Sequence, residues 1–371
     1  MKTALRLILV TVFLATSIPV KALTQKDSSP VTIGLPLALS GMAAEWGSAE
    51  LNAMRLALEE CRQKLNEKCP AVKLAVEDTK STSIGTVTAF HKLIDIDKAQ
   101  ILIGATWLDS YQGALPIATR KGVPVITTSA SISALNKKGD NPLIFSTYQR
   151  ADYQIEYLVK HLKRSGLKNL LMIFGEDPWW VAIEGYTIAA ARSNSINITK
   201  VIHTAPAQDS FRSEILKIKQ ARPDAVIFGF NNDAETVNFL KQWKELRAHS
   251  KLYTTEYISG FYAKKDFRSL VIGVRYVAPV AADPLFHKKY MARYKKAPVF
   301  SAANAYDAMN ITLSALQNGA IEAKKIGKFL KHSSFNTVSF GKVTFDKIGG
   351  VLGGRYKMME IKEGGPLKLD L

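Results

Sequence analysis

The sequence predicts an α/β protein whose chain is divided between two lobes, each with a parallel β-sheet flanked by helices. Apolar runs of strand length alternate with segments of helical periodicity through most of the 371 residues, an order typical of right-handed βαβ units. That length exceeds what one hydrophobic core usually supports, so two lobes fit it better than one. Because 47% of the residues are hydrophobic, the chain can bury a core and is not intrinsically disordered.

The first βα unit illustrates the pattern. A strand at 31–37 is followed by a helix over about 47–65, which places Leu51, Met54 and Leu58 on one face. Further strands are predicted at about 72–76, 101–103, 123–126, 170–174, 225–228 and 251–254. The helices predicted around them cover about 82–95, 110–120, 151–164, 181–193, 210–221 and 233–247.

Two stretches are predicted to carry the chain between the lobes: a loop near 142–149, and residues 278–284, where two prolines interrupt a strand. Helices at about 284–295 and 301–317 would then return to the first lobe, and the tail from Phe340 would form hairpin strands. The expected division is 30–147 plus 279–337 for lobe I, and 148–278 plus 338–371 for lobe II.

The first 22 residues have the layout of a cleavable secretory signal. Lys2 and Arg6 flank the start of an apolar run at 7–15, and Val20 and Ala22 supply small residues before a cut near Ala22. The apolar run is shorter than the roughly 20 residues that span a bilayer, and an uncleaved anchor is the alternative. We therefore expect a periplasmic protein. In that oxidising compartment, Cys61 and Cys69 are expected to form a local disulfide; a reactive thiol is the alternative.

The formal net charge is +18, and removing residues 1–22, with three basic and no acidic residues, leaves 18 − 3 = +15. The lysine pairs are scattered, so a solvated basic surface is expected; steering of anionic ligands or association with anionic membranes are alternatives. An exported chain without a basic recognition helix is expected to bind no nucleic acid.

Motifs that would indicate catalysis or a bound cofactor are absent from the sequence. It contains no His-Glu-x-x-His, no Cys-x-x-Cys, no phosphate loop, no dinucleotide fingerprint and no Gly-x-Ser-x-Gly elbow, and its six histidines are dispersed. We therefore expect a binding protein with no catalytic residues, metal or cofactor. An exported enzyme is the alternative and would require measurable turnover.

Six short segments carry a resemblance to a known family. They are 39–57 (LSGMAAEWGSAELNAMRLA), 77–79 (EDT), 103–106 (IGAT), 122–131 (GVPVITTSAS), 176–180 (EDPWW) and 228–232 (FGFNN). In order and spacing they resemble the type I periplasmic binding proteins of ABC importers, and most closely the leucine/isoleucine/valine-binding group. The resemblance covers about 30–360 and implies two Rossmann-like lobes, joined by three crossings, that close like a hinge on a small ligand.

The resemblance implies a carboxylate-binding wall in lobe I. The turn at 128–131, which includes Ser129, matches the family's carboxylate-binding turn, where backbone N–H groups and the Ser131 hydroxyl would hold the anion. Trp46 matches an aromatic residue that walls the side-chain pocket. Leu108 falls where branched-chain binders have a serine, and a small shift in register would give that role to Ser110. If Leu108 faces the cleft, one carboxylate donor is missing and a larger or aromatic ligand becomes plausible.

The resemblance implies an ammonium site and a cover in lobe II. Glu256 matches the family's ammonium-binding carboxylate, and a negative side chain in a closed cleft is costly unless a cation meets it. Trp179, with Trp180 as the alternative, matches an aromatic residue that covers the ligand on closure. Asn231 falls where the branched-chain group has a tyrosine.

Together these features predict a monomeric periplasmic protein that captures an amino acid or related small solute and delivers it to ABC permease subunits. A ligand sensor or cell-envelope regulator with the same fold is one alternative. Another is a solute that is not an amino acid, such as an aromatic acid or an amide.

Overall fold

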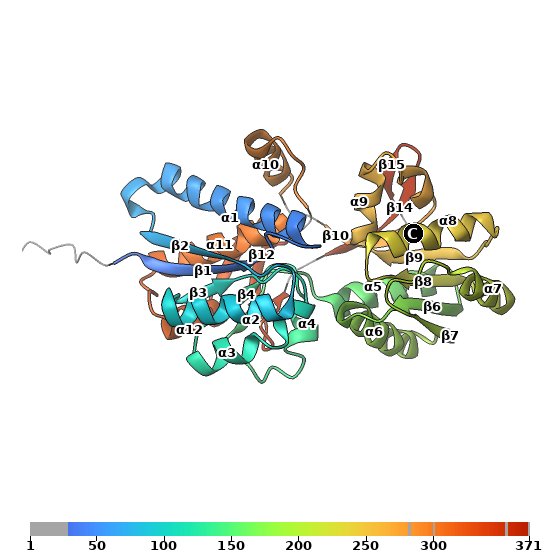
Figure 1. Cartoon of the computed structure of the whole chain (residues 1–371), viewed down its shortest axis with the longest axis horizontal. Helices are drawn as coiled ribbons and strands as arrows, with labels where there is room; N and C mark the ends of the chain where they lie inside the picture. The colour runs from blue at the N-terminus through green and yellow to red at the C-terminus, as the bar shows by residue number, and fades with distance from the viewer. Residues whose placement is uncertain (1–28, 281–282, 300, 353–354, 370–371) are drawn as a thin grey trace, which may run out of the picture.

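The computed structural model describes residues 29–280, 283–299, 301–352 and 355–369, so the predicted signal at 1–22 lies outside the described residues. Two α/β lobes lie side by side (Figure 1). The predicted fold class, parallel sheets flanked by helices in two lobes, is confirmed.

Lobe I is built on a five-stranded parallel sheet in the order β2-β1-β3-β4-β5. Its strands are β1 (Val31–Leu37), β2 (Val72–Asp78), β3 (Ile101–Ile103), β4 (Val125–Thr127) and β5 (Ile144–Ser146). Its main helices are α1 (Ala44–Leu65), α2 (Ser83–His91), α3 (Leu115–Lys121), α4 (Ile132–Leu135), α10 (Leu285–Tyr294), α11 (Ser301–Gln317) and α12 (Ala323–His332). Side chains of β1 such as Ile33 and Leu35 pack with α1 and α11 on one face, whereas Leu102 and Val125 pack with α2 and α3 on the other.

Lobe II is built on a seven-stranded sheet in the order β15-β14-β10-β9-β8-β6-β7. The strands are β6 (Asn169–Gly175), β7 (Asn197–Thr204), β8 (Ala225–Gly229), β9 (Lys251–Thr255), β10 (Arg275–Pro279), β14 (Tyr356–Lys362) and β15 (Gly365–Lys368). Strands β6 to β10 pair in parallel, and β14 adds antiparallel to β10. The helices are α5 (Ala151–Arg164), α6 (Pro178–Asn194), α7 (Arg212–Ala221), α8 (Asp233–Glu245) and α9 (Ser259–Ala263).

The chain passes between the lobes at three places: between β5 and α5, between β10 and α10, and between β13 (Val351–Leu352) and β14. The third passage differs from the boundary expected after residue 337. Strands β11 (Ser334–Thr337), β12 (Gly341–Phe345) and β13 form one small antiparallel sheet, and Val343 and Phe345 are buried in the core of lobe I. Residues 338–352 therefore belong to lobe I, because their apolar side chains fill its core.

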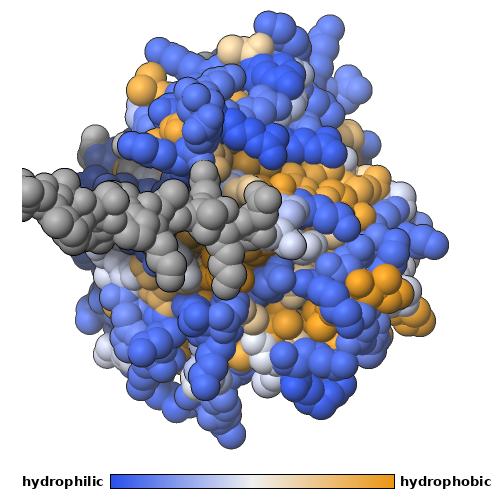
Figure 2. Space-filling view, turned by 90° about the vertical axis from the view of Figure 1, so that its left-hand side faces the viewer, coloured by the Kyte–Doolittle hydropathy of each residue, from blue (hydrophilic) through white to orange (hydrophobic). Residues whose placement is uncertain are grey.

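Cys61, near the end of α1, forms a disulfide with Cys69 just before β2. The end of the molecule on the lobe I side has a mainly hydrophilic surface with small apolar patches (Figure 2). None of the helices within the described residues has both the length and the apolar character needed to cross a bilayer.

Candidate ligand-binding cleft

The carboxyl ends of the parallel strands bring the predicted site residues together. In each lobe the strand order reverses, at β1 between β2 and β3, and at β6 between β7 and β8. Open α/β sheets bind ligands outside the carboxyl ends of their strands at such a reversal. All eight predicted ligand residues follow the carboxyl end of a strand: Trp46, Leu108, Ser110, Ser129, Ser131, Trp179, Asn231 and Glu256.

Two of the three predicted serines of lobe I, Ser129 and Ser131, use their hydroxyls to hold the cleft loops to one another. Ser129 Oγ accepts a hydrogen bond from the backbone N–H of Trp107 at 3.1 Å. Ser131 Oγ accepts one from the N–H of Ala151 at 3.0 Å and shares another with Ser133 Oγ at 2.9 Å. Ser131 thus links lobe I to the first residue of α5, so in this conformation its hydroxyl oxygen is a contact of the first crossing.

Leu108, and not Ser110, faces the space between the lobes. A groove of about 1030 Å³ is lined on the lobe I side by Leu108 and residues of α3 and 134–141, and on the lobe II side by 176–178 and the start of α6. Leu108 is on its wall, whereas Ser110 is buried beneath the surface. The residue of this loop that reaches the groove is therefore the apolar Leu108.

Four aromatic side chains of this region pair edge to face. The rings of Trp46 and Trp107 in lobe I lie 5.7 Å apart between centroids, and those of Tyr148 and Trp179 lie 6.1 Å apart. Trp179 is half-buried and packs against the cores of both lobes. Aromatic walls of this kind suit an apolar or aromatic portion of a ligand.

The alternative aromatic cover, Trp180, belongs to the core of lobe II. It is buried, its ring stacks on Phe174 with centroids 5.6 Å apart, and its Nε1–H donates to the Phe230 carbonyl at 2.8 Å. Of the two tryptophans, Trp179 is therefore the one at the junction of the lobes.

Glu256 is buried and held by three neutral donors. The hydroxyl of Tyr148 donates to Oε1 at 3.0 Å, and the side-chain amides of Gln149 and Gln154 donate to Oε1 and Oε2 respectively. Burial raises the pKa of Glu256, because no cation lies within 4.0 Å of it in the described part of the chain and neutral donors only partly replace water. The carboxyl ties the end of β9 to the first crossing and to α5.

Asn231 of lobe II has a buried side-chain amide that makes no hydrogen bond with the described residues. Both its Oδ1 and its Nδ2 are buried without a hydrogen-bond partner among the described residues, while its backbone N–H donates to Glu235 Oε2 at 3.1 Å. The amide packs directly on Gly175, at the reversal point of the sheet. Buried polar groups are nearly always paired, so this amide has the capacity to donate to and accept from a ligand.

A buried carboxyl of lobe I, Glu50, was not among the predicted residues. The sequence does contain a signal for it: Glu50 lies on the helical face that carries Ala53, Met54 and Ala57, all of which are fully buried. Glu50 Oε2 accepts a hydrogen bond from Thr106 Oγ1 at 3.0 Å, and burial raises the pKa of Glu50 to about 7.

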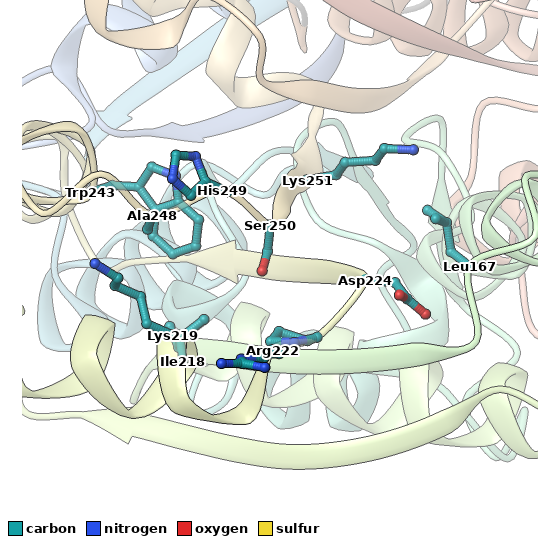
Figure 3. A pocket seen from close by; sticks show the side chains of 11 residues that line it. Leu167, Ile218, Lys219, Arg222, Asp224, Trp243, Ala248, His249, Ser250 and Lys251 are labelled. Atoms are coloured by element: carbon teal, nitrogen blue, oxygen red, sulfur yellow. The ribbon is translucent and has the colours of Figure 1, made fainter.

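A second pocket, of about 520 Å³, lies at the opposite end of the lobe II sheet (Figure 3). It is lined by residues before β6, β8 and β9 and includes Lys219, Arg222, Asp224, Trp243 and Lys251, but none of the predicted site residues. Lys219 and Arg222 are at the carboxyl end of α7, where cations complement the helix dipole. No group of three or more metal-ligating side chains occurs in the described ranges.

The structure has two α/β lobes, three passages of the chain and a groove between the lobes, and this is the architecture of a two-lobed binding protein. Of the eight predicted ligand residues, Leu108 alone lines that groove. Residues 30–366 match the periplasmic binding protein family, and the chain belongs to this family, as a type I member. Family membership implies an extracytoplasmic location.

Three relatives illustrate what the chain is similar to. The Leu/Ile/Val-binding protein BraC3 of Rhizobium johnstonii is 23% identical over 354 residues, covering 90% of this chain and 92% of that protein. A solute-binding protein of an ABC transporter from R. palustris, solved in complex with benzoate, superposes with a TM-score of 0.80 at 20% identity, covering 92% and 96% of the two chains. The leucine-binding protein LivK of Thermotoga maritima gives a TM-score of 0.79 at 20% identity, covering 92% and 98%.

Proposed function

We propose that the protein is the periplasmic substrate-binding component of an ABC importer and that it captures an amino acid or a closely related carboxylate. Lobe I would bind the solute first, hinge closure would bring lobe II onto it, and the closed form would dock on the permease subunits as a monomer. Nothing in this cycle changes the solute covalently. The named relatives include binders of leucine and of benzoate, which share a carboxylate group.

The observation that carries the amino-acid proposal is Glu256, a buried carboxyl beside the cleft with no cation near it in the described residues. A ligand ammonium group would provide the missing positive charge and repay the cost of burying the carboxylate. Asn231 supports the same proposal, since its unpaired amide can bond to polar groups of a solute.

An aromatic acid is the second candidate, and two observations favour it. The three neutral donors already on Glu256 allow that carboxyl to stay buried without a ligand cation. Leu108 places an apolar side chain on the groove wall, and the ring pairs of Trp46 and Trp179 provide flat apolar surfaces.

Mass spectrometry of the protein isolated from the periplasm, first native and then denatured, tests the proposal. An α-amino acid released on denaturation would support the first candidate, and an aromatic acid the second. A compound without a carboxylate would refute both. A ligand that is bound but not imported by cells would point instead to a sensor or cell-envelope regulator.

A further inference from the structure

Glu50 connects the three loops of lobe I that follow β1, β3 and β4. Its Oε2 accepts from Thr106 Oγ1 at 3.0 Å, and that same hydroxyl accepts the backbone N–H of Ala38, just after β1, at 3.2 Å. The hydroxyl of Ser129 also lowers the pKa of Glu50, and it accepts the N–H of Trp107. One carboxyl on α1 therefore orients hydroxyls in the loops that follow β3 and β4, and through them the loop after β1.

The surroundings of Glu50 favour its neutral form. It is completely buried, and its Oε1 has no hydrogen-bond partner among the described residues. Thr128 and Ser301 lie near it, and their hydroxyl oxygens are likewise buried without a partner in that part of the chain. A protonated carboxyl can donate to one of these oxygens, whereas an ionised carboxylate can only accept from the neutral hydroxyls around it, and these lower the pKa of Glu50 less than burial raises it.

The charged groups packed around α1 do not neutralise Glu50. Lys289 and Arg293 of α10 pair with Glu60 and Glu59, more than two turns further along α1, and no cation lies within 4.0 Å of Glu50 in the described ranges. The titratable groups that respond to its charge are the phenols of Tyr111 and Tyr148, both of which remain neutral because burial and nearby carboxylates raise their pKa values.

We propose that Glu50 is a positioning residue whose protonation is coupled to solute binding: lobe I takes up a proton at Glu50 when a carboxylate solute binds at the 128–131 turn. The proposal rests on the proposed function, because it needs an anionic solute beside that turn. A bound carboxylate adds negative charge next to hydroxyls that Glu50 shares, and like charges in a desolvated site disfavour each other. Binding therefore stabilises neutral Glu50, and ionised Glu50 weakens binding.

The direction and size of the pH effect follow from linkage. Burial raises the pKa of Glu50 to about 7 without ligand. If a bound carboxylate raises that pKa by one further unit, affinity falls by about tenfold between pH 6 and pH 9. Near pH 7.5, each binding event then takes up a fraction of a proton. Glu256 also titrates with a raised pKa in the cleft, so the comparison must isolate Glu50 by substitution.

Isothermal titration calorimetry with L-leucine and with benzoate, at pH 7.5 in buffers of different ionisation enthalpy, tests the proposal on the full mature protein. We expect the wild type to take up protons with whichever probe binds. Glu50→Gln, which mimics the neutral carboxyl, should bind with less proton uptake and a flatter profile between pH 6 and pH 9, and the remainder is the contribution of Glu256. Asp307→Asn is the matched control: burial also raises the pKa of Asp307 to about 7, but its oxygens accept backbone N–H groups of Val338 and Ser339 away from the cleft loops. This variant should keep the proton uptake.

A second measurement does not depend on a ligand. The infrared difference spectrum between ligand-free wild type and Glu50→Gln should contain a protonated carboxyl band at pH 6 that is lost by pH 9. Absence of that band, or unchanged proton uptake in Glu50→Gln, would overturn the role of Glu50 while leaving the proposed function intact. Failure of both probes to bind the wild type would instead overturn the carboxylate ligand class, and the coupling with it.

Discussion

Replacing Glu256 by glutamine separates the two candidate ligand classes. The substitution keeps the size of the side chain and removes its negative charge. The remaining amide oxygen can accept from Tyr148 and Gln149 at the Oε1 position, whereas the amide of Gln154 then meets an NH2 group in place of Oε2. If the ligand is an amino acid, its ammonium group loses a buried charged partner, which costs about 2–5 kcal/mol, or about 30-fold to several thousand-fold in Kd. An aromatic acid loses no such partner, and removal of a buried negative charge leaves its affinity equal or improved.

The assay is calorimetric titration of wild type and Glu256→Gln with the solute identified by mass spectrometry. Glu360→Gln is the control, since Glu360 is also buried in lobe II but pairs with Arg275 and Lys362 on the sheet. This control should change stability without changing affinity. An amino-acid ligand whose affinity falls less than threefold in Glu256→Gln would refute the assignment of Glu256 as the ammonium partner.

The remaining predictions concern stability and closure. Replacing both Cys61 and Cys69 by serine opens a short covalent loop and should lower the free energy of unfolding of lobe I by about 2.5 kcal/mol in urea titrations, an effect absent if both proteins are reduced. Gly229→Ala places a methyl group against the indole of Trp180 and should destabilise lobe II by about 1–3 kcal/mol. Gly185→Ala, in open space within α6, should instead stabilise it by up to about 1 kcal/mol. A higher melting temperature for Gly229→Ala than for Gly185→Ala would contradict this packing. Trp179→Ala should weaken solute binding at least about tenfold because the ring contacts both lobes, and an unchanged Kd in fluorescence titration would exclude it from the closed site.

Two helices are predicted from the sequence to the residue, although α5 buries one face and α11 is buried over most of its surface. The helices expected at 151–164 and 301–317 begin and end at those residues in α5 and α11. Strand β7 was not predicted because it lies at the sheet edge, where most of its side chains are exposed and no apolar run forms. Helix α12 was missed as well, although Ile326 and Leu330 lie on one buried face and its lysines are exposed, which is the pattern of an amphipathic helix.

The position of the candidate site could be predicted from the sequence, but its bonding could not. Strand ends are local features, so the loops that meet at the cleft follow from the strand order. The bonds of Ser131 and Glu256 cannot be predicted in this way, because their partners Ala151 and Gln149 reach them only through the first crossing between the lobes. Whether a hydroxyl or carboxyl is free for a ligand depends on such contacts between distant segments, and no spacing in the chain reveals them.

The packing of α1 against α11 has a consequence for the order in which the chain folds. Strands β6 to β10 of lobe II follow one another within 169–279, so most of that sheet forms from segments close in sequence. Lobe I instead needs α11, which begins at Ser301 and covers the apolar face of α1. Closing so long a stretch of chain is slow. An exported chain would therefore keep its first lobe unfinished, and able to pass through a membrane channel, until nearly all of it has been synthesised.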